Sequence, residues 1–397
     1  MTLSRPTARL KVHPEDFVVD EIPAYAPSGA GDHVYVRFTK RDRTTMDVVR
    51  AIARALGCDP RAAGFAGMKD KRAVTTQTFS LQPPRGTTAA DLAARARRLA
   101  LEGPDGLDGV TLHEATQHPH KMKPGHLAGN RFTITLRGLD PARVPEVTAA
   151  LEGIARTGVG NAFGDQRFGN KGDNATRALA WLRGEERGPR DPRMQRFLWS
   201  SLQSAVFNAV LAERVADGTW VTPLAGDLLK LRTSGGLFGC ADVQTDRARA
   251  ATGEVSPTGP IIGARMRWPE GEPAALERRV ADGILGADFD LEKTRSLGEG
   301  SRRALRLWVQ DLGWEVGAGV TPPLPEAPAS PKSARDAGEA PDPGKSHACI
   351  RVYFVLPKGA YATTVLAAAV ELDEARPAPS SGSSEDSSAD EGEADER

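Results

Sequence analysis

The stretch GMKDKRAVT, residues 67–75, is the densest polar segment of the chain. It places one carboxylate, Asp70, among three cations, Lys69, Lys71 and Arg72, directly before a run with strand character. Neighbouring positive charge favours the ionised form of a carboxylate, and the same cations attract a phosphate backbone. From these residues alone, the stretch is either a reactive carboxylate in a positive site or an exposed charged turn.

Alternating side chains predict strands on both sides of this stretch. Apolar and polar residues alternate at 9–22, 33–38, 73–81, 131–136 and 348–356, and these segments are rich in Val, Phe, Tyr and Thr. A period of two with this composition is typical of strands. We therefore expect strands mainly toward the two ends of the chain.

Helical periodicity occurs at three places. Residues 49–56 place apolar side chains at i, i+3, i+4 and i+7, Thr44 or Thr45 can cap the start, and a glycine follows the end. Residues 91–101 predict a basic helix. The longest expected helix spans about 196–216, with one apolar stripe and a glycine just beyond it.

The middle of the chain, from about residue 158 to 307, has a mostly helical pattern. Strand-rich ends around a helical middle predict an α+β fold in which an inserted domain interrupts another, although three separate domains fit the same pattern. We expect the split domain at 1–157 and 308–370, the insertion at 158–307, and an acidic disordered tail at 371–397. Seven prolines predict an extended loop at 322–346.

The charge is distributed unevenly along the chain. The formal net charge is zero, from 52 basic and 52 acidic residues, but residues 371–397 carry 10 acidic and only 2 basic side chains. Residues 1–370 therefore carry 50 basic and 42 acidic ones. A mildly basic body with an acidic tail fits either a nucleic-acid-binding surface or a basic protein with a solubilising tail.

The composition excludes several classes of protein. Apolar residues make up 40% of the 397 residues, enough for a packed core. The sequence contains no apolar run of 18 residues and no secretory signal, so we expect neither a membrane-spanning helix nor a membrane partner. Three scattered cysteines do not support a disulfide framework or a zinc knuckle, and a reducing cytoplasm is the expected location.

Five motifs, in order along about 350 residues, resemble those of the TruD family of transfer-RNA pseudouridine synthases. They are HPEDFVV at 13–19, GMKDKRAVT at 67–75, GNRFT at 129–133, NAFGDQRFG at 161–169 and LPKGAYAT at 356–363. The fourth motif departs from the family, because alanine stands at its second position where the family usually has tyrosine.

The resemblance implies a pseudouridine-synthase catalytic domain with a mixed, mainly antiparallel sheet, interrupted by a mostly helical family-specific insertion. It also implies that the protein isomerises uridine-13 in the D arm of tRNA to pseudouridine. The implied partner is tRNA, and the family needs no metal or organic cofactor. Nothing in the sequence implies a protein partner, so we expect a monomer.

By the same resemblance, Asp70 is the catalytic nucleophile. A carboxylate in a closing site needs a nearby cation to stay ionised. Lys11 is the expected partner, because it precedes the first motif at a spacing similar to that of a family lysine. Lys69 and Lys71 point away from Asp70 if the segment is extended, and with Arg72 they are candidates for ion pairs or phosphate contacts. Whether Asp70 attacks C1′ or the base stays open.

Four further residues carry over as substrate contacts. Asn130 offers an amide that can bind a uracil edge. Phe17 offers a hydrophobic face, Tyr361 a ring that can stack, and Phe132 shares the strand face of Asn130. Without the resemblance, Phe17 and Phe132 are plain core residues and Asn130 is a turn or cap residue.

Two other kinds of function fit parts of the sequence. His118, His120 and His126 could bind zinc, although their spacing matches no common motif. A non-catalytic RNA-binding protein would also use the basic stretches at 71–98 and 117–137. Only an enzyme gains from a carboxylate within such a positive region.

Overall fold

The structure is a computed structural model, which describes residues 4–103, 107–169, 171–318 and 347–374. The proline-rich loop at 322–346 and most of the acidic tail lie outside these residues. Within the described ranges, no helix combines the length and apolarity needed to cross a bilayer.

The chain divides into two compact units. Unit 1 comprises Met1–Leu151, Gln310–Gly359 and Ala369–Arg397, and unit 2 comprises Glu152–Val309 and Ala360–Ala368. Unit 2 therefore includes a short second segment near the end of the chain. The sequence prediction had assigned that segment to the split domain.

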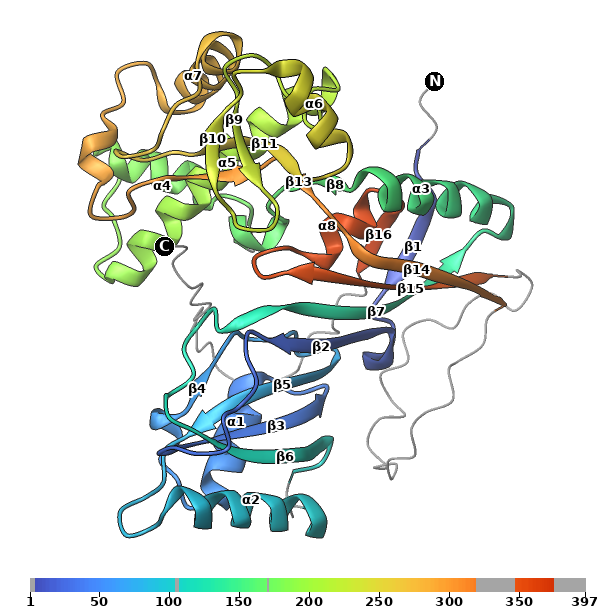
Figure 1. The fold of residues 1–397 in the computed structure, drawn as a ribbon, viewed down its shortest axis with the longest axis vertical. Helices are drawn as coiled ribbons and strands as arrows, with labels where there is room; N and C mark the ends of the chain where they lie inside the picture. The colour runs from blue at the N-terminus through green and yellow to red at the C-terminus, as the bar shows by residue number, and fades with distance from the viewer. Residues whose placement is uncertain (1–3, 104–106, 170, 319–346, 375–397) are drawn as a thin grey trace. The chain divides into compact units, whose positions relative to one another are not determined.

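Unit 1 is built on a ten-stranded sheet with the main order β14-β15-β7-β2-β5-β3-β6 (Figure 1). These strands are β14 (Gln310–Ala318), β15 (Ala348–Pro357), β7 (Leu127–Leu139), β2 (Phe17–Pro23), β5 (Val74–Leu81), β3 (His33–Arg41) and β6 (Val110–His118). Off this path lie β1 (Thr7–Leu10), β4 (Gly64–Phe65) and β16 (Glu371–Glu374). Two pairs, β2 with β5 and β1 with β16, are parallel and the others antiparallel, which confirms the mixed, mainly antiparallel sheet.

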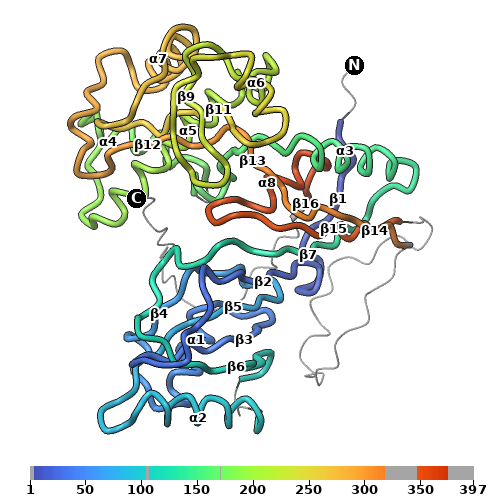
Figure 2. The backbone as a smooth tube through the Cα atoms, in the orientation of Figure 1, coloured from blue at the N-terminus to red at the C-terminus, as the bar shows by residue number. Residues whose placement is uncertain are grey.

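The first and the last strand of the described residues pair in this sheet. The blue N-terminal and red C-terminal segments run side by side in Figure 2, where β1 pairs with β16. Residues 371–374 thus form a strand, and the prediction of disorder from residue 371 was wrong for them. This strand is held by main-chain pairing and not by the burial of apolar side chains. Its acidic sequence therefore carried no strand signal.

Two amphipathic helices cover one face of the sheet at β3 and β6 (Figure 1). They are α1 (Thr45–Ala55) and α2 (Ala89–Glu102). Thr44, one of the two threonines that the sequence offered as a cap, caps α1 by accepting the Asp47 amide. Ile52 of α1 and Leu92 of α2 pack in the core of this layer, and both are fully buried. A third helix, α3 (Val144–Thr157), begins in unit 1 and ends in unit 2.

The strand register defines which side chains share the helix-covered face. Lys40 of β3 pairs with Thr75 of β5, Thr75 with Val19 of β2, and Val19 with Phe132 of β7. Directly paired residues point to the same face of a sheet. Since residues alternate along a strand, Phe17 joins this face, as do Glu21 and its partner Asn130. The first, second and third motifs therefore meet on one side of the sheet.

Among the described residues, unit 2 holds five α-helices besides the end of α3, from the 25-residue α5 to the six-residue α8. They are α4 (Asn174–Leu182), α5 (Pro192–Ala216), α6 (Val243–Ala251), α7 (Gly271–Leu285) and α8 (Ala362–Ala367). Its strands are β8 (Val159–Gly160), β9 (Leu228–Leu231), β10 (Leu237–Gly239), β11 (Val255–Ile261), β12 (Ser301–Ala304) and β13 (Arg306–Leu307). The 3-10 helices of the two units are Pro14–Asp16, Pro60–Ala62, Pro141–Arg143, Asp165–Phe168 and Leu291–Thr294.

The long helix expected near 196–216 is α5, but the sheet β10-β9-β11-β12 was not expected. Helix still exceeds strand in unit 2, so the insertion is mostly helical. The sequence missed β11 because its residues, VSPTGPI, are buried on both faces and contain two prolines and a glycine. Such a segment shows no alternation.

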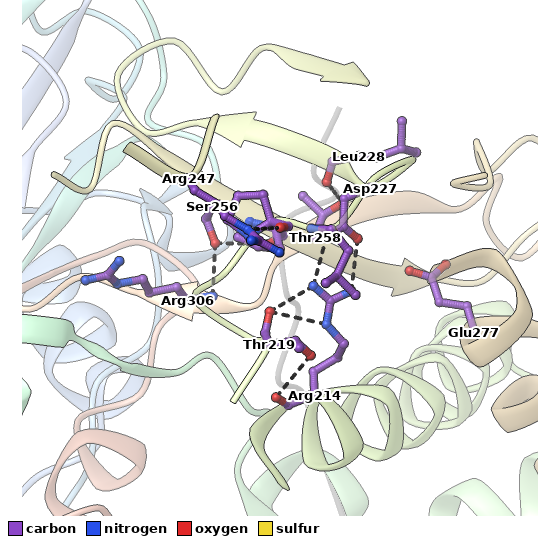
Figure 3. A network of polar contacts seen from close by, with 12 residues as sticks. Arg214, Thr219, Asp227, Leu228, Arg247, Ser256, Thr258, Glu277 and Arg306 are labelled. Atoms are coloured by element: carbon purple, nitrogen blue, oxygen red, sulfur yellow. Dashed lines mark hydrogen bonds and ion pairs between the residues drawn. The ribbon is translucent and has the colours of Figure 1, made fainter. Parts of the chain in front are cut away.

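Buried ion pairs join the helices of unit 2 to this sheet. Arg214 of α5 donates to both carboxylate oxygens of Asp227 at 2.9 Å and to the carbonyl of Thr219 (Figure 3). Arg302 of β12 makes a similar pair with Glu277 of α7, and these two side chains are 3% and 2% exposed. Burial raises the pKa of Glu277 even though Arg302 opposes the shift.

Candidate active site

Asp70 lies in an irregular segment between β4 and β5, four residues before β5 begins. Lys11 Nζ donates to Asp70 Oδ1 at 3.2 Å. The Asp70 side chain is 39% exposed and that of Lys11 is 11% exposed. The structure thus brings the predicted carboxylate and its predicted cation together, with the carboxylate still open to an incoming molecule.

An unusual backbone conformation at Lys11 sets the direction of its side chain. It follows β1 directly and has a φ of 56°, in the left-handed region that non-glycine residues rarely adopt. Two contacts anchor the chain beyond it: Arg72 donates to the Val12 carbonyl at 3.0 Å, and Arg137 pairs with the buried Asp16 at 2.7 Å. The surrounding fold therefore holds this conformation in place.

Aromatic rings line the other side of Lys11. Its Nζ lies 4.6 Å from the centroid of the Phe17 ring, and Phe17 meets Phe132 edge-on at 6.1 Å. Phe132 in turn packs against Phe354 of β15 at 5.4 Å. Phe17 and Phe132 are both buried. The arrangement offers an apolar wall with a cation at its edge.

Asn130 presents a buried acceptor on the same face. It lies on β7 between Glu21 of β2 and Leu356 of β15. Its Oδ1 is buried and makes no hydrogen bond within the described part of the chain. Buried side-chain oxygens are normally paired, so this atom can accept a hydrogen bond from a bound molecule.

Lys69 is not available to a phosphate. Its Nζ lies 2.6 Å from the Glu21 carboxylate, and the side chains are 7% and 1% exposed. Glu21 also accepts the Thr78 amide at 3.3 Å. Of the two roles expected for Lys69, an ion pair or a phosphate contact, the structure shows a buried ion pair. Lys71, by contrast, is exposed.

Two residues near Asp70 were missed by the sequence analysis. The first is Glu21. The second is Lys40, whose Nζ donates to the main-chain oxygen of Asp70 at 2.6 Å. The sequence carried a partial signal for Glu21. Glu21 follows Phe17 and Val19 at a spacing of two, and such alternation places all three on the buried face.

Tyr361, the last predicted substrate contact, belongs to unit 2. It occupies the N-cap position of α8 and packs against a cluster that contains Phe163 and Phe207. Nearby, Asn161 accepts from Arg303 at 2.6 Å and donates to the Ala304 carbonyl at 2.9 Å. The fourth motif thus builds structure within this unit.

The three histidines of the zinc alternative lie in an aromatic cluster. The His118 ring stacks on Tyr25 at 5.2 Å, and His126 Nδ1 bonds the Tyr25 hydroxyl at 2.8 Å. His120 meets His118 edge-on. Nowhere in the described ranges do three or more His, Cys, Asp or Glu side chains form a group that could hold a metal ion.

Comparison with known proteins identifies close relatives over most of the chain. The family described as tRNA pseudouridine synthase D (TruD) matches residues 3–186 and 190–368. A protein named tRNA pseudouridine synthase D from Anaeromyxobacter dehalogenans is 41% identical over 92% of this chain and 93% of its own. One with the same name from Anaeromyxobacter sp. is 45% identical over 76% of this chain and 83% of its own.

A solved structure has the same fold. It is titled as a putative tRNA pseudouridine synthase D from Methanosarcina mazei and aligns with a TM-score of 0.68 at 23% sequence identity. The alignment covers 93% of this chain and 95% of the other.

Proposed function

Because this chain belongs to the TruD family of tRNA pseudouridine synthases, we propose that it isomerises uridine-13 in the D arm of tRNA to pseudouridine, with Asp70 as the nucleophile. The reaction breaks the bond from ribose C1′ to uracil N1, and the detached base rotates and rejoins through C5. All atoms are retained, so no co-reactant is consumed. The observation that carries the proposal is the open Asp70 carboxylate held 3.2 Å from Lys11.

The uridine must leave its stack to reach Asp70. Flipping a nucleotide costs a few kcal/mol, and stacking on an aromatic ring returns about 1–3 kcal/mol. In the proposed complex, Phe17 and Phe132 form an apolar wall for the base. Tyr361 of unit 2 is also proposed as a substrate contact, through a ring that can stack. The buried Oδ1 of Asn130 accepts the N3–H of uracil, which satisfies an atom that is otherwise unpaired.

The substrate backbone needs positive charge around the site. Lys71, next to Asp70 and exposed, is proposed to contact phosphate together with Arg72. The protein is proposed to act as a monomer in the cytoplasm. Its three cysteines are buried free thiols, which suits a reducing compartment.

The decisive experiment compares wild type with Asp70→Asn, which keeps the size of the side chain and removes its charge. Pseudouridine is mapped chemically in a tRNA pool after incubation with each protein, and tRNA affinity is measured by filter binding. We expect the variant to bind tRNA with similar affinity and form no pseudouridine. Modification by the variant would remove Asp70 as nucleophile, and a wild type that binds without modifying would favour a non-catalytic RNA-binding protein.

A second experiment tests the position. A tRNA transcript with uridine at position 13 is compared with one carrying cytidine there. We expect modification only of the first, at that position. Pseudouridine at another site in both transcripts would show a different target.

A further inference from the structure

Lys40 lies at a buried position, where removing its ammonium group from water costs free energy. Val34, Val36 and Phe38 precede it along β3 at a spacing of two and pack in the core beneath α1 and α2. Lys40 continues this buried face and is 0% exposed. Burying an ammonium group requires polar partners that replace water.

The recorded partner of Lys40 Nζ is the main-chain oxygen of Asp70, at 2.6 Å. Among the described residues, no carboxylate forms an ion pair with Lys40. Lysines buried only for packing are rare, so this contact is the chemical reason for a lysine at this place. It connects the end of β3 to the residue that carries the proposed nucleophile.

The charges around Lys40 belong to the same small region. The pKa of Lys40 is lowered to about 8: burial is the main cause and Lys69 adds to it, whereas Asp70 and Asp42 oppose the shift. At neutral pH Lys40 is therefore still mainly a cation. It lies beneath Asp70 on the main-chain side, while Lys11 meets the carboxylate itself.

The segment around Asp70 has no regular structure of its own and depends on such contacts. Thr45 accepts the Lys69 amide at 3.0 Å, Lys69 pairs with Glu21, and Arg72 donates to Val12. These contacts fix the residues before and after Asp70. Only the contact of Lys40, among those recorded in the described residues, is made to the main chain of Asp70 itself.

We propose that Lys40 is a positioning residue, which fixes the main chain of Asp70 so that the carboxylate meets Lys11 and which adds a buried positive charge that favours its ionised form. The proposal rests on the proposed function of Asp70. In this proposal, a residue of the buried strand β3 supports the reaction without touching the substrate.

The test uses the full-length protein with two variants. Lys40→Met keeps the length of the side chain and removes both donor and charge, and Lys40→Gln keeps a donor and removes the charge. We expect kcat to fall about 10- to 100-fold in Lys40→Met and less in Lys40→Gln, with KM for tRNA within about twofold. The fall of kcat above about pH 8, where Lys40 of the wild type loses its proton, should be absent from both variants.

Thr39→Val is the matched control. Thr39 is the neighbouring residue of β3, points to the other face, and bonds Thr76 at 2.7 Å. We expect this variant to lose little activity and keep the wild-type pH profile. Circular dichroism and thermal unfolding establish that each variant is folded.

Several results would overturn the proposal. Folded Lys40 variants with wild-type kcat and pH profile would show that the contact is not used. A loss of activity with an unchanged pH profile, or failure of both variants to fold, would show that Lys40 only maintains the structure. Asp70→Asn is measured in parallel: activity in that variant would refute the proposed nucleophile, whereas an inactive Asp70→Asn with fully active Lys40 variants would refute this inference alone.

Discussion

Lys11 acts on Asp70 through a contact that solvent partly screens. With 39% of the Asp70 side chain exposed, the ion pair contributes about 0–1 kcal/mol to stability. We therefore expect Lys11→Met to fold normally and to lower kcat for pseudouridine formation by about 100-fold, because the closed site loses a preorganised cation. Single-turnover kinetics with saturating enzyme measure this. Lys293→Met, which removes an exposed lysine of unit 2, is the control, and equal rates in the two variants would contradict the role of Lys11.

Asn130 allows a second test at the scale of one residue. Its Oδ1 is buried and unpaired, so Asn130→Ala leaves no buried protein donor without its partner. We expect a partial loss, with kcat/KM for tRNA lower by about tenfold and stability changed by less than about 1 kcal/mol, the size of one typical hydrogen bond. A variant with full activity would remove Asn130 from the site. Phe17→Ala is a poorer test, since Phe17 is buried and its truncation costs about 3–5 kcal/mol of stability.

The sequence could predict the residues that a motif identifies, but not their supporting partners. The contact of Lys11 with Asp70 follows from motif spacing. Lys40 and Glu21 were missed because a charged residue within an alternating strand is normally assigned to solvent. Their burial depends on what packs over the strand, and that is decided by the tertiary fold.

At the scale of elements, the ion pair of Glu21 and Lys69 joins β2 to the segment before β5. We expect Glu21→Gln to lower the free energy of unfolding by about 3–5 kcal/mol, because it leaves the buried Lys69 ammonium without its counter-charge. Urea unfolding measures the change.

The neighbouring residue supplies the control. Asp20 pairs with Arg37 at 2.5 Å on the other face of β2, but its side chain is 40% exposed. Asp20→Asn should therefore cost less than about 1 kcal/mol. Similar costs for the two variants would show that burial does not decide the value of the Glu21 pair.

Elements with a clear period were predictable and the others were not. The helices α1 and α5 follow their apolar stripes, and α1 begins at the threonine cap that the sequence indicated. The sheet of unit 2 was missed because its strands are short. The strand β12, for example, has the sequence SRRA, which shows no apolar alternation. In such strands the main-chain ladder and buried ion pairs replace the apolar alternation on which sequence interpretation depends.

At the scale of the whole molecule, each unit has its own core and its own buried charges. In unit 2 the pair of Arg214 with Asp227 links α5 to the residue before β9, and both side chains are almost fully buried. In unit 1, Lys40 is buried without a carboxylate in direct contact. Unit 1 also contains the buried ion pairs of Glu21 with Lys69 and of Arg137 with Asp16, and in addition it holds this buried lysine, through which pH affects its stability.

Lys40 makes the stability of the protein depend on pH in a window that its pKa defines. In the unfolded chain a lysine holds its proton up to about pH 10.4, whereas the pKa of Lys40 in the folded protein is lowered to about 8, chiefly by burial. Between these values unfolding takes up a proton, so raising the pH from 8 to 10 stabilises the folded state, by up to about 3 kcal/mol. Lys40→Met lacks this group. Urea unfolding of both proteins at pH 7, 8, 9 and 10 should show the free energy of wild type rising relative to the variant, since other groups titrate equally in both. Parallel pH profiles would mean that Lys40 keeps an ordinary affinity for its proton in the folded protein.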